Sequence, residues 1–260
     1  MSKEIKSTVK KTNLEINYED FINPENTETI VILHWWGWSS QSWLQVWELL
    51  LQNGINVIIP DLPGFWKTKL EKVFDLDEYA IVIEEFIKEL NLDNIILWWH
   101  SNWWAISIKL AKRWKINISR LILNNSAWIR NDKKRNLKRK ILKSVVNNFK
   151  FLKKFFIFKK LRILFYKAIW WQDYLNAEKN PYLKETYLNM ISSDLQDDIK
   201  ELKNHTLLIW WEKDTYTPRN DWLKMRNSIK NSKLVVLENE KHWIHLTSPE
   251  KLVKTFLENI

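Results

Sequence analysis

Six short aliphatic runs recur along this chain, and segments with helical spacing of apolar residues separate most of them. Each run is almost continuously apolar, which is typical of strands in a parallel sheet that is covered on both faces. The runs lie at residues 29–34, 56–61, 94–99, 120–125, 206–211 and 233–238. We read all six as buried strands, and residues 7–20 predict one or two further strands at the edge of the sheet.

Four other segments carry apolar residues three or four positions apart, which predicts amphipathic helices. They lie at residues 42–52, 76–90, 103–114 and 248–260. Ser248 followed by Pro249 is a good start signal for the last of these helices. Alternation of strands and helices implies right-handed crossovers, so we expect an α/β fold with a doubly wound sheet.

Residues 130–200 interrupt this alternation and carry most of the positive charge. Residues 131–169 contain 14 Lys or Arg and one acid, a net charge of +13, whereas the whole chain carries +10. The rest of the chain therefore sums to −3, and the basic character belongs to one segment. We expect residues 130–200 to form a helical cap, inserted into a core made of residues 1–129 and 201–260 and not independent of it.

The basic segment has three interpretations. In the first, it is an amphipathic cap helix with Phe and Leu toward the substrate pocket and Lys toward solvent. In the second, residues 131–169 make a weak contact with an anionic membrane surface. A contact with nucleic acid is the third, and we do not expect it because no nucleic-acid motif accompanies the charge.

Composition excludes several other classes of protein. The chain has no Cys, which excludes a disulfide framework and a Cys-based metal site. The first 13 residues are polar and lack the apolar stretch of a signal peptide. No stretch approaches 18 uninterrupted apolar residues, so we expect no membrane-spanning helix and a cytoplasmic protein. We also expect neither a cofactor nor a metal.

Polar clusters follow most of the predicted strands. They read HWWGWSSQSW (34–43), PDLPGFWKT (60–68), WHSNWW (99–104), WEKDTYTP (211–218) and EKHWIHLTSP (240–249). Ligands of open α/β sheets bind in the crevice at the carboxyl ends of the strands. Five clusters at one edge of the sheet therefore predict an active site there.

These clusters resemble the motifs of the α/β-hydrolase fold family over nearly the full length of the chain. The family has His-Gly, Asp-x-Pro-Gly-x-Gly, Gly-x-Ser-x-Gly, an Asp at a strand end and a late His. The matching positions here are His34-Trp35, Asp61 to Trp66, Trp99 to Trp103, Asp214 and His242. The resemblance implies an α/β-hydrolase fold: a mostly parallel eight-stranded sheet, helices on both faces and a helical cap insertion.

The resemblance also implies a catalytic triad. Ser101 would be the nucleophile, which needs an adjacent base because a serine hydroxyl is weakly acidic. His242 would be that base, with His245 more simply a structural or pocket-lining neighbour. Asp214 would orient the imidazole, and the order Ser-Asp-His is that of the family. The backbone N–H groups of Trp36 and Asn102 would form the oxyanion hole. Asp61 would hold the turn that follows it.

On this basis we expect a serine hydrolase that cleaves a carboxylic ester or a similar acyl bond of a small molecule through an acyl-enzyme. A C–C bond hydrolase or an acyltransferase could use the same triad. A catalytically inactive binding protein with this fold is the alternative from a different class.

Every departure from the family motifs is a Trp where the family has Gly. The chain has 18 Trp and 3 Gly, whereas average usage predicts roughly 18 Gly in a chain of this length. The codon UGA is read as stop, Trp or Gly in different genetic codes, so we hypothesise that many of these Trp are Gly in the natural protein. A truly Trp-rich, inactive protein is the alternative. The positions in question are Trp35, Trp38, Trp66, Trp99, Trp103, Trp104, Trp128, Trp211 and Trp243.

Overall fold

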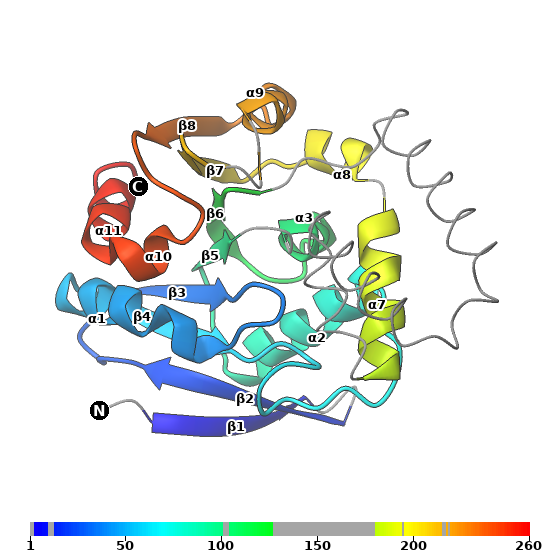
Figure 1. Cartoon of the computed structure of the whole chain (residues 1–260). Helices are drawn as coiled ribbons and strands as arrows, with labels where there is room; N and C mark the ends of the chain where they lie inside the picture. The colour runs from blue at the N-terminus through cyan, green and yellow to red at the C-terminus, as the bar shows by residue number, and fades with distance from the viewer. Residues whose placement is uncertain are drawn as a thin grey trace, which may run out of the picture.

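The computed structural model describes residues 3–9, 13–100, 104–126, 180–193, 195–214, 217 and 219–260. Its strands alternate with helices along most of the chain (Figure 1). The strands are β1 (Lys3–Val9), β2 (Leu14–Phe21), β3 (Glu28–Leu33), β4 (Ile55–Pro60), β5 (Ile95–His100), β6 (Ile118–Asn124), β7 (His205–Trp211) and β8 (Ser232–Leu237). The α-helices are α1 (Leu44–Gln52), α2 (Leu76–Glu89), α3 (Trp104–Arg113), α7 (Pro181–Ser192), α8 (Gln196–Lys200), α9 (Arg219–Ser228), α10 (Ile244–Thr247) and α11 (Pro249–Leu257).

All eight strands form one sheet in the order β1-β2-β4-β3-β5-β6-β7-β8. The pairs β1–β2 and β2–β4 are antiparallel, and the other five pairs are parallel. The expectation of a mostly parallel eight-stranded sheet is therefore confirmed. The strand order turns back at β3, which lies between β4 and β5, and such a point places a crevice at the carboxyl edge of the sheet.

Hydrophobic residues fill a core on each face of the sheet. Trp43, Leu50 of α1 and Phe256 of α11 pack on one face, together with apolar side chains from the central strands. Tyr79 of α2 and Ile106 of α3 belong to the core on the other face. Figure 1 shows α1 and α11 on one side of the sheet and α2 and α3 on the other. Helices thus cover both faces, as near-continuous apolar strands require.

Several elements differ from the expectations: the short helix α10 was not predicted, and β1 begins at Lys3, before the predicted range 7–20. Strand β8 is an edge strand, and only Leu237 of its six residues is buried, because one side of β8 has no neighbouring strand. The prediction of a buried strand there was wrong. Helix α9 was not expected, because it has almost no apolar face and Met225 is its one buried residue.

Helices α7 and α8 fall within the range expected for the cap. Helix α7 begins at Pro181, and Asn180 is its N-cap residue. The Asn180 side chain accepts hydrogen bonds from backbone N–H groups of the first turn. The hydroxyl of Thr186 accepts a hydrogen bond from the N–H of Phe74, 2.9 Å away, so α7 lies against the loop that follows β4. The remainder of the expected cap, including the basic segment 131–169, lies outside the described residues.

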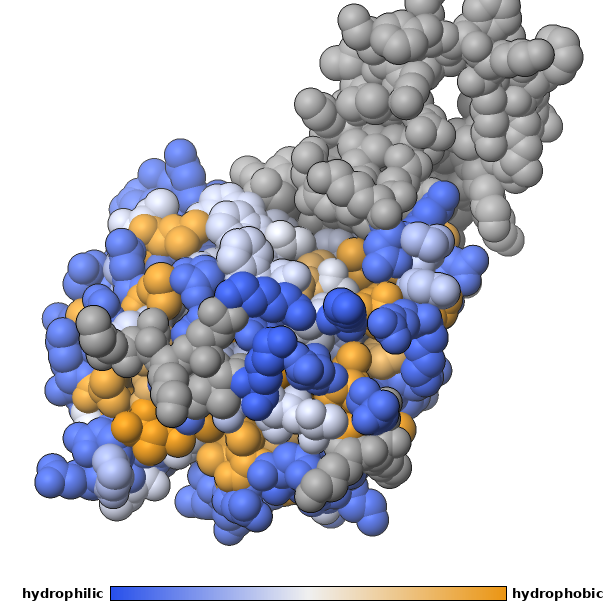
Figure 2. Space-filling view, turned by 90° about the horizontal axis from the view of Figure 1, so that it is seen from below, coloured by the Kyte–Doolittle hydropathy of each residue, from blue (hydrophilic) through white to orange (hydrophobic). Residues whose placement is uncertain are grey.

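Charged side chains accompany the exposed edge of the sheet. Lys6 of β1 forms an ion pair with Glu15 of β2. On the face shown in Figure 2, hydrophilic side chains separate several hydrophobic patches. Charges on an edge strand disfavour pairing with the edge of another molecule.

In the part of the chain that the structure describes, no helix is both long and apolar enough to cross a membrane.

Candidate active site

Asp214 and His242 form a buried pair at the carboxyl edge of the sheet. Asp214 lies just after β7, and His242 lies between β8 and α10. The Nδ1 atom of His242 is 2.7 Å from Oδ2 of Asp214, and the two side chains are 2% and 0% exposed. A carboxylate on Nδ1 fixes the imidazole tautomer with its proton on that atom, which leaves Nε2 able to accept a proton.

Two further side chains contact the Asp214 carboxylate. The amide nitrogen of Asn125 and the hydroxyl of Thr217 both donate to Oδ2, the latter at 2.6 Å, and the N–H of Thr217 donates to Oδ1 at 3.3 Å. Burial raises the pKa of the Asp214 carboxyl, but hydrogen bonds from His242, Thr217 and Asn125 and the charge of His242 outweigh it. The net pKa lies below its usual value, so Asp214 stays ionised.

Asn125 and Thr217 were not expected from the sequence. Asn125 directly follows β6, so a search for polar residues at strand ends includes it in principle. Thr217 lies within the cluster at 211–218 and stood out only through its neighbour Asp214.

His100 and His245 lie close to His242. The ring centroids of His100 and His242 are 5.0 Å apart, and those of His100 and His245 are 4.8 Å apart. Burial holds the pKa of His100 well below its usual value, and burial together with the charge of His242 lowers the pKa of His245 to about 3. Both neighbours are therefore neutral near pH 7. His242 is the member of this cluster that is paired with a carboxylate.

The loop after β3 is held from two sides. The Nδ1–H of His34 donates to the carbonyl of Trp35 at 2.8 Å, and its Nε2 accepts from the N–H of Leu62 at 3.0 Å. Burial lowers the pKa of His34, which suits this neutral form. The loop also contains Trp36, a buried residue expected to contribute its N–H to an oxyanion hole.

Asp61 differs from its expected role. Its carboxylate accepts hydrogen bonds from the N–H of Ser40 at 2.8 Å and the side chain of Asn17 at 2.9 Å. Asp61 therefore holds the earlier loop after β3 and strand β2. In the turn that follows Asp61, the N–H of Gly64 donates to the carbonyl of Thr68 at 3.0 Å instead.

Ser101 and Asn102, the expected nucleophile and second oxyanion donor, lie outside the described residues. The chain is described up to His100 at the end of β5 and again from Trp104 at the start of α3. The Nε2–H of His100 donates to the carbonyl of His242 at 3.1 Å. His100, the residue directly before Ser101 in the chain, thus contacts the loop that carries His242, the expected base.

Three of the nine Trp questioned from the sequence form a cluster that reaches His242. The Trp35 and Trp243 ring centroids are 4.4 Å apart, and those of Trp38 and Trp243 are 5.3 Å apart. The Trp35 ring centroid is 5.1 Å from that of His242. These indoles fill space at the edge of the sheet where we expect the substrate.

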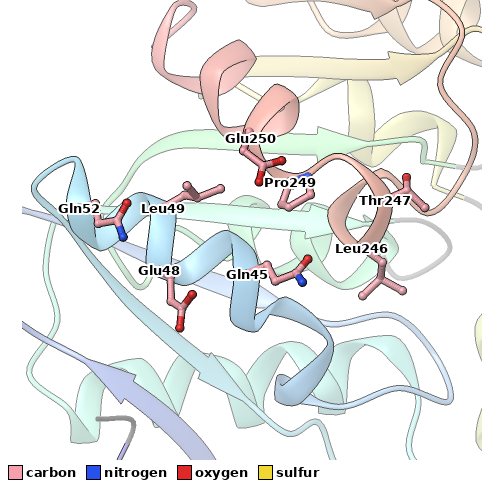
Figure 3. A pocket seen from close by; sticks show the side chains of 8 residues that line it. All are labelled: Gln45, Glu48, Leu49, Gln52, Leu246, Thr247, Pro249 and Glu250. Carbon is pink, nitrogen blue, oxygen red and sulfur yellow. The ribbon is translucent and has the colours of Figure 1, made fainter.

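A pocket of about 380 Å³ lies away from this pair, between α1 and the adjoining ends of α10 and α11 (Figure 3). Its lining includes Glu48, Gln52, Leu246 and Glu250. Neither Asp214 nor His242 lines it, so it is separate from the candidate active site. Among the described residues, no cluster of His, Asp and Glu could hold a metal ion.

Comparison with known proteins relates the whole fold to one family. The model of the Alpha/beta hydrolase family matches residues 30–255. A 2-hydroxy-6-oxononadienedioate/2-hydroxy-6-oxononatrienedioate hydrolase of Pseudomonas putida is 23% identical over 94% of this chain and 92% of its own length.

Two solved structures share the fold. A bromoperoxidase from Bacillus anthracis superposes with a TM-score of 0.75 at 17% identity, covering 98% of this chain and 99% of its own. An esterase from Exiguobacterium antarcticum gives 0.73 at 21% identity, covering 99% and 98%. The expected α/β-hydrolase fold is confirmed, and the matches agree with the expectation of a hydrolase.

Proposed function

Because the chain belongs to the alpha/beta hydrolase family, we propose that it is a serine hydrolase that cleaves a carboxylic ester or a similar acyl bond of a small molecule. The catalytic residues of this proposal are Ser101, His242 and Asp214. The observation that carries it is the buried hydrogen bond of 2.7 Å between His242 and Asp214 at the carboxyl edge of the sheet. A buried imidazole on an ionised carboxylate is a suitable general base.

The proposed reaction has two halves. Ser101 Oγ attacks the acyl carbon while its proton passes to Nε2 of His242, and the negative oxygen binds the N–H groups of Trp36 and Asn102. The intermediate then collapses to an acyl-enzyme, and the leaving alcohol takes the proton from His242. Water next attacks the acyl-enzyme, with His242 again as base, and releases the acid and free Ser101.

The proximity of His100 to the base supports Ser101 as the nucleophile. The residue directly before Ser101 donates a hydrogen bond to the carbonyl of His242, and successive Cα atoms are about 3.8 Å apart. The contact of His100 with the loop that carries the base therefore supports the choice of Ser101, which follows His100 in the chain.

A fluorophosphonate probe, which labels activated serines, tests the proposal. Two forms of the chain are compared: the sequence as it stands, and a glycine form with Gly at the nine Trp positions given above. We expect labelling of Ser101 in the glycine form and loss of labelling in Ser101→Ala. Ser119→Ala is the matched control, because Ser119 bonds to the carbonyl of Ile95 at the start of β5, at the opposite edge of the sheet. A folded glycine form without labelled Ser101 contradicts the proposal and favours an inactive binding protein.

A C–C bond hydrolase is the second candidate, favoured by the Pseudomonas putida relative, whose name describes the hydrolysis of a 2-hydroxy-6-oxo dienedioate. The same triad would serve, so labelling does not separate the two. Parallel assays with p-nitrophenyl esters of increasing chain length and with a 2-hydroxy-6-oxo dienedioate separate them by the ratio of kcat/KM.

A further inference from the structure

We propose that Asn125 and Thr217 are positioning residues that hold the Asp214 carboxylate against His242. The inference rests on the proposed function, because it concerns how the third member of that triad is held. Neither residue contacts the imidazole in the interactions described above, so each would act through Asp214.

Hydrogen bonds fix both the backbone and the side-chain amide of Asn125. It is fully buried, its backbone N–H donates to the carbonyl of Ile209 at 3.0 Å, and its Oδ1 accepts from the N–H of Trp211 at 3.1 Å. Because Oδ1 is occupied by a donor, the amide nitrogen must face Asp214, to which it donates. Asn125 thus connects the end of β6 to the carboxylate that follows β7.

Thr217 is fixed by its own neighbours. The indole N–H of Trp210 donates to both the carbonyl and the hydroxyl oxygen of Thr217, each at 3.1 Å. The hydroxyl oxygen is thereby held, and its proton is directed to Oδ2 of Asp214 at 2.6 Å. Asn125 also donates to this hydroxyl oxygen at 3.3 Å, so the two residues form one network.

This network fixes the direction in which the carboxylate points. Oδ2 receives His242, Asn125 and Thr217 together, and Oδ1 receives the Thr217 N–H. Rotation of the carboxylate away from the imidazole would break several of these bonds at once. Hydrogen bonds to charged groups are stronger than those between neutral groups. Loss of one of them should therefore lower the rate of the chemical step. Substrate binding should be unchanged, because both residues act through Asp214.

Three substitutions test the inference in whichever form of the chain hydrolyses p-nitrophenyl esters. We expect Thr217→Val to lower kcat roughly tenfold or more at unchanged KM, and Thr217→Ser to restore most of it. Asn125→Asp replaces a donor to Asp214 by a second carboxyl in contact with it, and two carboxyls in contact share a proton, so we expect the acid limb of the kcat/KM profile to differ from that of the parent. Thr206→Val is the control, because Thr206 is a buried Thr at the other end of β7.

The outcomes separate the two claims. If Thr217→Val keeps the wild-type kcat and Asn125→Asp keeps the wild-type acid limb, the inference is wrong while the proposed function stands. If the parent protein neither hydrolyses esters nor labels at Ser101, both fail. Asn125→Asp decides the matter if Thr217→Val does not fold.

Two tryptophans have a backbone conformation that is unusual for a bulky residue. We also infer that Trp66 and Trp114 occupy positions where the natural protein has glycine. Their φ angles are +48° and +52°, in the left-handed region that is an outlier for a bulky residue. Every other described residue with positive φ is Gly or Asn, the two residue types best suited to it.

Trp114 was not among the nine positions suspected from the sequence, and no family motif contains it. It is the first residue after α3 and is 53% exposed. The two preceding long helices are also followed by a residue at positive φ, Gly54 two residues after α1 and Asn91 two residues after α2. A left-handed residue at this place is most often Gly and sometimes Asn.

Thermal unfolding and mass spectrometry test this second inference. Trp66→Gly and Trp114→Gly should each raise Tm by about 2–4 °C, because glycine adopts left-handed φ without strain. Trp43→Gly is the control and should lower Tm, since Trp43 is buried at φ −107°. Peptides of the protein from its natural source should carry Gly at 66 and 114. Trp in those peptides, or a lower Tm in both variants, contradicts the inference.

Discussion

The imidazole of His245 stacks on the indole of Trp43, with ring centroids 4.9 Å apart and planes 23° from parallel. His245 is buried, and its burial together with the charge of His242 lowers its pKa to about 3. The unfolded chain takes up a proton at this residue near its ordinary pKa of 6.5, whereas the folded chain does not. Stability from this residue is therefore full above pH 6.5 and is lost as the pH falls toward 3.

His245→Phe keeps an aromatic ring on Trp43 and removes this titration. Between pH 6 and pH 4, we expect the free energy of unfolding to fall less steeply than in the parent, by about 1.4 kcal/mol per pH unit. Urea unfolding at several pH values measures it. The exposed His205, replaced by Gln, is the control. An unchanged slope in His245→Phe would show that His245 is not buried in its neutral form.

His100 should stabilise the loop that carries His242 through the 3.1 Å hydrogen bond to its carbonyl. His100→Phe leaves that buried carbonyl without its donor, so we expect a loss of about 1–3 kcal/mol in the free energy of unfolding. His100→Gln supplies a new N–H donor and should lose less. Equal losses in the two variants would mean that packing, and not the hydrogen bond, determines the effect.

The α2–α3 contact contains a buried carboxylate. Glu84 is 3% exposed and accepts hydrogen bonds from Arg113 and Lys88, both at 2.6 Å. We expect Arg113→Ala to reduce the free energy of unfolding by about 1.5–3 kcal/mol, because it removes a charged donor from a buried carboxylate. Lys200→Ala breaks an exposed pair with Asp197 and should cost less than about 0.5 kcal/mol. Similar losses from both would contradict the burial of Glu84.

Gly64 and Gly54 separate backbone strain from steric contact. Both have positive φ, +92° and +79°. A Cβ at Gly64 would lie 2.8 Å from Cδ1 of Leu183 in α7, whereas at Gly54 its nearest neighbour would be 3.9 Å away. We expect Gly54→Ala to cost about 1–2 kcal/mol from strain, and Gly64→Ala about 1–3 kcal/mol more from overpacking.

Chemical unfolding of both variants, and of Gly64→Ala combined with Leu183→Ala, measures this difference. The second substitution removes the nearest atom that a Cβ would meet and leaves two atoms of Leu70 at 3.2 and 3.3 Å, so the additional cost of Gly64→Ala should shrink in that background without vanishing. An equal cost in both backgrounds would argue against close packing of α7 on the loop.

Strands β3 to β8 could be predicted because each is a short apolar run between polar segments. The partial exposure of β8 could not be predicted, because the same kind of apolar run occurs in edge strands and in central strands. Helix α9 escaped prediction because tertiary contacts at Met225, and not a broad apolar face, hold it.

The candidate site was accessible from sequence only in part. Asp214 and His242 follow strands and match a family motif, so their approach could be anticipated. Asn125 is one polar residue after a strand, and its contact with Asp214 depends on β6 and β7 being neighbours, which no local pattern specifies. The contacts of Asp61 with Ser40 and Asn17 likewise depend on the order of strands in the sheet.

An acyl-enzyme on Ser101 tests the central claim most directly. The glycine form is mixed with p-nitrophenyl butyrate, quenched in acid within milliseconds to seconds, digested and analysed by mass spectrometry. We predict a butyryl group on the peptide that contains Ser101, absent from Ser101→Ala and strongly reduced in His242→Ala. Turnover of the ester by a folded protein without acylation of Ser101 at any time point would contradict the claim.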